Sequence, residues 1–155
     1  MRIFAALPLC VQYFNAHIVG WIARYVIRYR SSVVKINIDN AFPELDSKAR
    51  KKIYRDFYLH FGQLVCETIW FGGSSAKRLK KSHIVEIENP QELQHLYDCA
   101  PGTIVLCSHI GNWELYGGIP YYNYTQQPMP VNYDNASVVY RKLKSPMWDE
   151  IFKTN

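Results

Sequence analysis

Residues Thr103–Glu114 read TIVLCSHIGNWE, and this stretch decides the predicted fold. Its first five residues, Thr103–Cys107, form a short apolar run that contains β-branched side chains and follows the turn pair Pro101-Gly102. Such a run is typical of a strand buried on both faces in the parallel sheet of an α/β domain. The sequence then becomes polar at Ser108 and His109. Because open α/β sheets place their chemistry just beyond the carboxyl ends of strands, His109 stands where an active-site residue is expected.

The spacing of His109 and Glu114 predicts where each must lie if the two act together. Within one helix, five residues at about 100° each would place the side chains on different faces. They meet only if His109 lies on the turn and Glu114 in the first helical turn, with Gly111 permitting the bend. A carboxylate that accepts a hydrogen bond from one imidazole nitrogen fixes the tautomer and raises the basicity of the other nitrogen. That second nitrogen can then take a proton from a hydroxyl as a general base. The alternative is that His109 only caps the helix.

The residues before this stretch extend the prediction to a β-α-β unit. HIVEIE, residues His83–Glu88, is predicted to form a strand. A capping box and a first-turn proline mark the start of the short helix that follows, at Asn89, Pro90 and Glu92. With TIVLC as the second strand, these elements form a β-α-β unit of the doubly wound kind. The predicted fold class is therefore α/β, with N-terminal helices followed by a β-α-β sheet domain.

A long helix is predicted between residues 48 and 71. Asp46 or Ser47 caps it, and Gly72-Gly73 ends it. The predicted core face of this helix is an apolar stripe made of Ile53, Phe57, Phe61, Leu64 and Thr68. Basic residues crowd its first turns and recur at positions 77–81. This density favours an acidic partner, although solvated lysines explain it almost as well.

Residues 1–30 are predicted to form a membrane-associated N-terminal helix, and residues 31–155 the α/β domain. Apolar residues recur at three-to-four spacing in the first segment, at Ile18, Trp21, Ile22, Tyr25 and Val26. An apolar face with Trp and Tyr beside arginines suits a helix lying in the interface of an anionic bilayer. Two alternatives stay open: the helix packs on the soluble domain, or Arg2 and the apolar run after it belong to a signal peptide.

Three blocks of the sequence occur in the order and at the spacing of one known family. SHIGNWE, residues 108–114, resembles the His-x-x-x-x-Asp/Glu motif of glycerolipid acyltransferases, in the fuller form His-x-x-Asn-Trp-Glu. YRSSVVKINIDNAFPE, Tyr29–Glu44, precedes it, and VVYRKLKSP, Val138–Pro146, follows it with Lys142 where proline is usual. Together these blocks resemble the bacterial lipid A biosynthesis (lauroyl/myristoyl) acyltransferases, over roughly Tyr29 to Phe152.

The resemblance implies an O-acyltransferase of the glycerolipid acyltransferase type at the cytoplasmic face of a bacterial inner membrane. The implied donor is an acyl thioester on acyl carrier protein, and the implied acceptor is a hydroxyl of a lipid A precursor, with no further cofactor. His109 is the implied general base, and Glu114 orients and charges its imidazole. Because the family is nearly twice as long, we expect a truncated member whose C-terminal part is missing.

Substrate contacts are predicted for five residues, which are Asn112, Trp113, Tyr140, Arg141 and Lys144. Asn112 and Trp113 are expected to hold the turn or shape the pocket. Arg141 and Lys144 come at the end of a third predicted strand, near residues 137–140. There they either bind a phosphate near His109 or form a solvated basic turn. Two other functions stay open: acyl transfer to a lysophospholipid or glycolipid, and a non-catalytic membrane-surface fragment.

The length, charge and composition of the chain exclude some kinds of partner and site. The chain has 155 residues, 48% of them hydrophobic, which suffices for one domain with a core. A net charge of +5 without a recognition motif argues against nucleic acid. The scattered histidines predict no metal site. The four cysteines show no CxxC pair, and buried thiols in a reducing compartment are expected.

Overall fold

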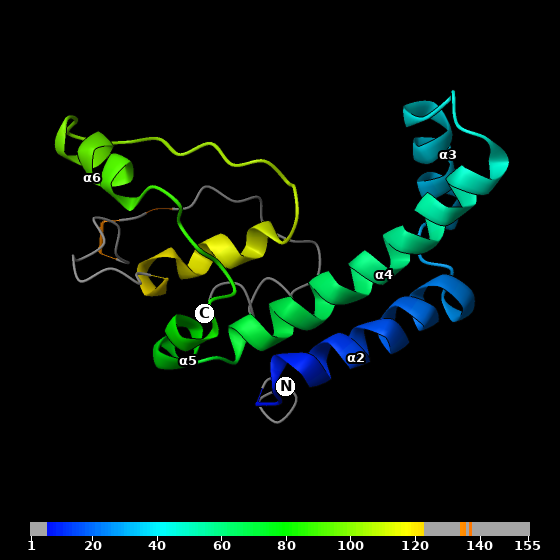
Figure 1. The fold of residues 1–155 in the computed structure, drawn as a ribbon, viewed down its shortest axis with the longest axis horizontal. Coiled ribbons are helices and arrows are strands. Elements are labelled where there is room, and N and C mark those ends of the chain that lie inside the picture. The colour runs from blue at the N-terminus through cyan, green and yellow to red at the C-terminus, as the bar shows by residue number, and fades with distance from the viewer. Residues whose placement is uncertain (1–5, 123–133, 136, 138–155) are drawn as a thin grey trace. The chain divides into compact units, whose positions relative to one another are not determined.

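The computed structural model describes residues 6–122, 134–135 and 137, and within these residues the chain is helical (Figure 1). The chain forms two compact units. The first comprises Met1–Ser74 together with His109–Asn112, and the second comprises Ser75–Ser108 and Trp113–Asn155. The functional division predicted at residue 30 stays a prediction.

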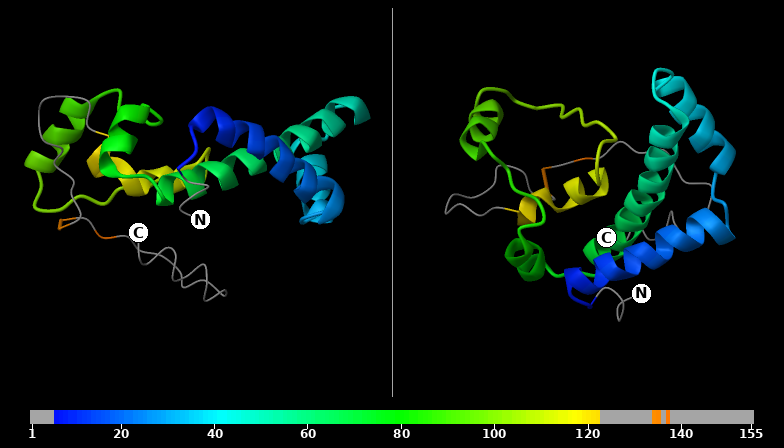
Figure 2. Two further views of the ribbon diagram at one scale, coloured as in Figure 1. Left: turned by 90° about the horizontal axis from the view of Figure 1, so that it is seen from below. Right: turned by 45° about the vertical axis from the view of Figure 1, so that its right-hand side comes forward.

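Helices α2 (Leu9–Trp21) and α4 (Ser47–Gly72) are the main pair of the first unit. They lie side by side in all three views (Figures 1 and 2). A π-helical turn, η1 (Ile22–Val26), continues α2, and α3 (Ser31–Ala41) connects it to α4. The first unit is therefore a small helical bundle.

The long helix predicted between residues 48 and 71 is confirmed by α4. Its N-cap is Asp46, whose Oδ1 accepts a hydrogen bond from the backbone N–H of Ala49 at 2.7 Å. That bond satisfies one of the four N–H groups that a helix leaves unpaired at its start. The helix ends at Gly72, as the glycine pair indicated.

The contact between α2 and α4 is closest at small residues, and it does not run through the predicted apolar stripe of α4. The residues of α2 and α4 that are buried are Gln12, Ala16, Gly20, Tyr58, Gly62, Cys66 and Trp70. A Cβ added at Gly62 would clash with the carbonyl oxygen of Ala16, and one at Gly20 would lie 2.5 Å from that of Tyr58. The two backbones are therefore in direct contact.

This close packing corrects the predicted core face of α4. Ile53, Phe61, Leu64 and Thr68 are only half-buried, and Phe57 is 38% exposed. The physical reason is that two helices approach most closely where side chains are smallest, so the glycine-containing stripe becomes the contact. Tyr58 is 1% exposed, and its hydroxyl donates to the carbonyl oxygen of Tyr29 at 2.8 Å. Its burial raises the pKa of Tyr58 to about 12.

The apolar face of α2 and η1 that the sequence predicted for a membrane stays exposed. Its five predicted side chains are 37% to 63% exposed, namely Ile18, Trp21, Ile22, Tyr25 and Val26. Because the contact of α2 with α4 is closest at Ala16 and Gly20, these large side chains remain outside it. Within the described part of the chain, no helix combines the length and the apolar character needed to cross a bilayer.

The second unit contains α5 (Ala76–Ser82), α6 (Pro90–Asp98) and the 3₁₀ helix η2 (Trp113–Tyr121). Helix α5 contacts η2, and Leu79 and Leu115 are buried. The predicted start of α6 is confirmed, with Pro90 in its first position. The predicted capping box differs in detail. The side-chain amide of Asn89 donates a hydrogen bond to the carboxylate of Glu92, and the Asn89 side chain does not cap the backbone of the helix.

The predicted β-α-β sheet is wrong for the described residues, none of which forms a strand. Residues 103–107 run without regular secondary structure, and Ile104 and Leu106 are 90% and 92% exposed. Residues 83–88 form a turn and bends or have no regular secondary structure. A strand is stabilised only when a neighbour pairs with its N–H and C=O groups, and neither run has such a neighbour among the described residues. The third predicted strand, near 137–140, lies largely outside them.

Candidate active site

The bend predicted within the motif is present at Gly111. Its φ is +63°, a left-handed conformation that side-chain-bearing residues rarely adopt. A Cβ added there would meet no atom within 4 Å, so the backbone conformation alone requires glycine. His109, two residues earlier, is exposed and therefore accessible to a substrate.

Glu114 lies in the first turn of η2, where the spacing argument expected a helical position. Trp113 begins the same helix and is 37% exposed. His109 belongs to the first unit, whereas Trp113 and Glu114 belong to the second. The pairing of His109 with Glu114 therefore stays a prediction.

Asn112 is anchored within the first unit by a residue that the sequence did not single out. Its Nδ2 donates to Oε2 of Glu67 at 2.9 Å, and the hydroxyl of Tyr13 donates to Oε1 of the same carboxylate at 2.9 Å. Oδ1 of Asn112 is buried and has no hydrogen-bond partner in the described part of the chain. One carboxylate on α4 thus holds both the motif segment and α2.

Glu67 changes the ionisation of its neighbours. Burial, and then the hydrogen bond and negative charge of Glu67, raise the pKa of Tyr13 to about 12. Burial and then Glu67 also raise the pKa of the Cys66 thiol. Glu67 was not predicted from the sequence, and the signal that could have found it is a lone acid in the apolar stretch LVCETIWF near the end of the long helix.

Three of the predicted substrate-binding residues, Tyr140, Arg141 and Lys144, lie outside the described residues. Among the residues that the structure does describe, no cluster of three metal-ligating side chains occurs. The cysteines are free thiols, and only Cys66 is buried. The expected burial is thus wrong for Cys10, Cys99 and Cys107, which are exposed.

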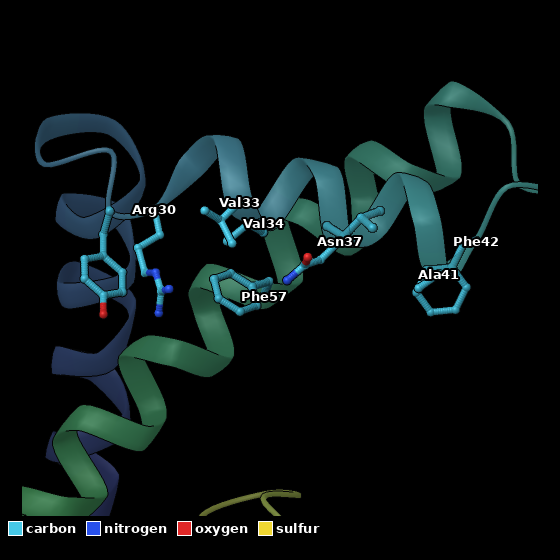
Figure 3. Close-up of a pocket in the computed structure, with 9 residues that line it drawn as sticks. Arg30, Val33, Val34, Asn37, Ala41, Phe42 and Phe57 are labelled. Atoms are coloured by element: carbon cyan, nitrogen blue, oxygen red, sulfur yellow. The ribbon is translucent and has the colours of Figure 1, made fainter.

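A groove of about 420 Å³ lies between α3 and α4 (Figure 3). Its lining is mostly apolar, with one cation, and comprises Tyr29, Arg30, Val33, Val34, Asn37, Ile38, Ala41, Phe42 and Phe57. Eight of these nine residues belong to the block Tyr29–Glu44 that carried the family resemblance. That block therefore forms a concave surface rather than only an interhelical core.

Comparison with models of known protein families assigns this chain to one of them. The sequence model of an acyltransferase family matches residues 1–152, which are nearly the whole chain. Its description is bacterial lipid A biosynthesis acyltransferase, and the chain belongs to this family, as the three sequence blocks indicated. Neither the curated proteins nor the solved structures that were compared include a match.

Proposed function

We propose that this chain transfers a fatty acyl group from a thioester on acyl carrier protein to a hydroxyl of a lipid A precursor. The observation that carries the proposal is the family match, which includes the His-x-x-Asn-Trp-Glu segment. The exposed imidazole of His109 and the bend at Gly111 support it, because a general base must be accessible to the substrate hydroxyl.

In the proposed reaction, His109 removes the proton of the acceptor hydroxyl while that oxygen attacks the thioester carbonyl. The carbon–sulfur bond then breaks, an ester bond remains, and the departing thiolate takes the proton from the imidazolium. Glu114 orients the ring and stabilises its positive charge. Atoms and charge balance without a covalent enzyme intermediate.

Exposed lysines support an acidic carrier protein as the donor. Lys48 and Lys51 on α4 and Lys77, Lys80 and Lys81 on α5 are exposed. The chain carries a net charge of +5. Such density raises the local concentration of acidic partners and speeds their association.

The exposed face of α2 and η1 supports contact with a membrane surface, and the family resemblance implies the cytoplasmic side of the bacterial inner membrane. This face combines branched, Trp and Tyr side chains with Arg24, whose guanidinium lies 4.7 Å from the ring centroid of Tyr25. Aromatic and apolar side chains enter the lipid interface, while arginines contact anionic headgroups.

Replacing Trp21 by glutamate is expected to weaken binding to phosphatidylglycerol-containing vesicles at least about tenfold. Inserting a large apolar side chain contributes roughly 1.5–3 kcal/mol, and a carboxylate is repelled by the anionic surface. Trp21 is 57% exposed, so the fold should tolerate the change. Vesicle flotation measures the effect.

The matched control is Leu96→Glu, at an apolar α6 residue that is 52% exposed. Equal vesicle binding by the Trp21→Glu and Leu96→Glu variants would exclude the face of α2 and η1 as the membrane contact.

The proposed reaction is tested with purified chain and acyl carrier protein that bears a radiolabelled acyl thioester. The acceptors are a lipid A precursor, a lysophospholipid and a glycolipid in parallel reactions. We expect label in the lipid A precursor. Label only in another acceptor would reassign the substrate within the superfamily. No transfer to any acceptor, with vesicle binding intact, would favour a non-catalytic membrane-surface role.

A further inference from the structure

We infer that Glu67 is a positioning residue for the catalytic segment, and this inference rests on the proposed function. Its two carboxylate oxygens accept hydrogen bonds from two different parts of the first unit. Oε2 accepts from Nδ2 of Asn112, and Oε1 accepts from the hydroxyl of Tyr13, each at 2.9 Å. Among the described residues, the hydrogen-bond partners of Glu67 are Tyr13 and Asn112, so we infer that it acts on the catalytic segment through Asn112.

The carboxylate is held in place by the helix that carries it. Cys66, the residue before Glu67, is 0% exposed, and Trp70 is 2% exposed. Tyr13 comes from α2, whose backbone is in direct contact with that of α4 at Gly62. With both oxygens bonded and both helices packed, Glu67 has little rotamer freedom left, so its position is set before substrate binds.

The bond to Asn112 limits the freedom of the His109–Asn112 segment. Residues 101–110 are exposed and lie outside regular secondary structure, so His109 is not part of a helix. Between His109 and Asn112 stands Gly111, whose backbone has more conformational freedom than that of other residues. The hydrogen bond at Asn112 holds this segment three residues from His109, and misplacing a catalytic group by about 1 Å can cost about a hundredfold in rate.

The geometry also fixes which atom of the Asn112 side chain faces Glu67. A carboxylate only accepts hydrogen bonds, so the amide must present its NH₂ group there, which leaves Oδ1 on the other side. Replacing Asn112 by aspartate would oppose two carboxylates. Adding Glu67→Gln would restore the pair, because the glutamine amide donates to the new carboxylate while its oxygen still accepts from Tyr13.

The test compares Asn112→Asp, Glu67→Ala and the double variant Asn112→Asp/Glu67→Gln with the unchanged chain. We expect each of the first two to lower kcat about 10- to 100-fold with KM for the acyl donor nearly unchanged. The double variant should recover to within about threefold. Glu44→Gln removes an exposed carboxylate elsewhere and should leave kcat unaltered.

Backbone order parameters of residues 108–112, measured by NMR relaxation, give a readout independent of activity. The order parameters should fall in Asn112→Asp and Glu67→Ala, and should return to the original values in the double variant. Unchanged order parameters in Glu67→Ala would overturn the inference, as would restored order parameters without restored kcat. If the unchanged chain transfers no acyl group, the proposed function fails, and the order parameters alone decide whether Glu67 anchors the segment.

Discussion

Replacing His109 by alanine is expected to lower the rate of acyl transfer about 10²- to 10⁴-fold, the usual contribution of a general base. The imidazole acts on the hydroxyl proton only as the transition state forms. The loss should therefore fall on kcat, with KM for the acyl donor nearly unchanged. Because His109 is exposed, the variant should keep its helical circular dichroism and its stability.

His60→Ala is the matched control for this prediction. His60 is also an exposed histidine, on α4, and has no role in the proposed chemistry. Its variant should retain full transfer in the same radiolabel assay. If His109→Ala keeps transfer within about threefold of the unchanged chain, His109 is not the base.

Replacing Gly62 by alanine is expected to destabilise the first unit by about 2 kcal/mol or more. Overpacking a tight contact usually costs 1–3 kcal/mol. Here the new methyl group would meet the backbone of Ala16 and Gly20, and backbone atoms cannot rotate aside as a side chain does. Alanine improves helix propensity by about 1 kcal/mol, so any net loss of stability reports the clash itself.

Urea unfolding followed by circular dichroism measures this effect. Gly102→Ala is the control, because a Cβ at Gly102 would meet no atom within 4 Å. We expect a lower urea midpoint for Gly62→Ala and little change for Gly102→Ala. An unchanged or raised midpoint for Gly62→Ala would contradict the direct contact of α2 with α4.

The helices that carry local signals were predicted well from the sequence. Asp46 and the glycine pair marked the ends of α4, and Pro90 marked the start of α6. Caps and breakers act within a few residues, so their information is present in the local sequence. The sheet depended on partners distant along the chain, and an apolar run such as TIVLC contains no information about whether those partners are present.

The packing face was harder to predict for a related reason. Large apolar side chains suggested the core, but the contact runs through Ala16, Gly20 and Gly62, which a hydrophobicity pattern gives little weight. The Trp and Tyr face of α2, predicted for a lipid interface, remained exposed. Side-chain size decided how closely the backbones approach, and hydrophobicity did not.

Part of the candidate site followed from sequence spacing. The bend at Gly111 and the helical position of Glu114 are both present. Glu67 was missed because its contact with Asn112 spans 45 residues, and no local pattern connects the two. Long-range hydrogen bonds of this kind depend on how the helices pack, which the sequence pattern did not reveal.

The proposed mechanism requires that Glu114 acts through the imidazole of His109. A double-substitution cycle on acyl transfer measures whether the two side chains act together. Residues that act as a unit lose activity non-additively. Glu114→Ala alone should slow transfer at least about tenfold, whereas in a chain that already carries His109→Ala it should have no further effect. If the two losses multiply instead, the carboxylate does not act through the imidazole.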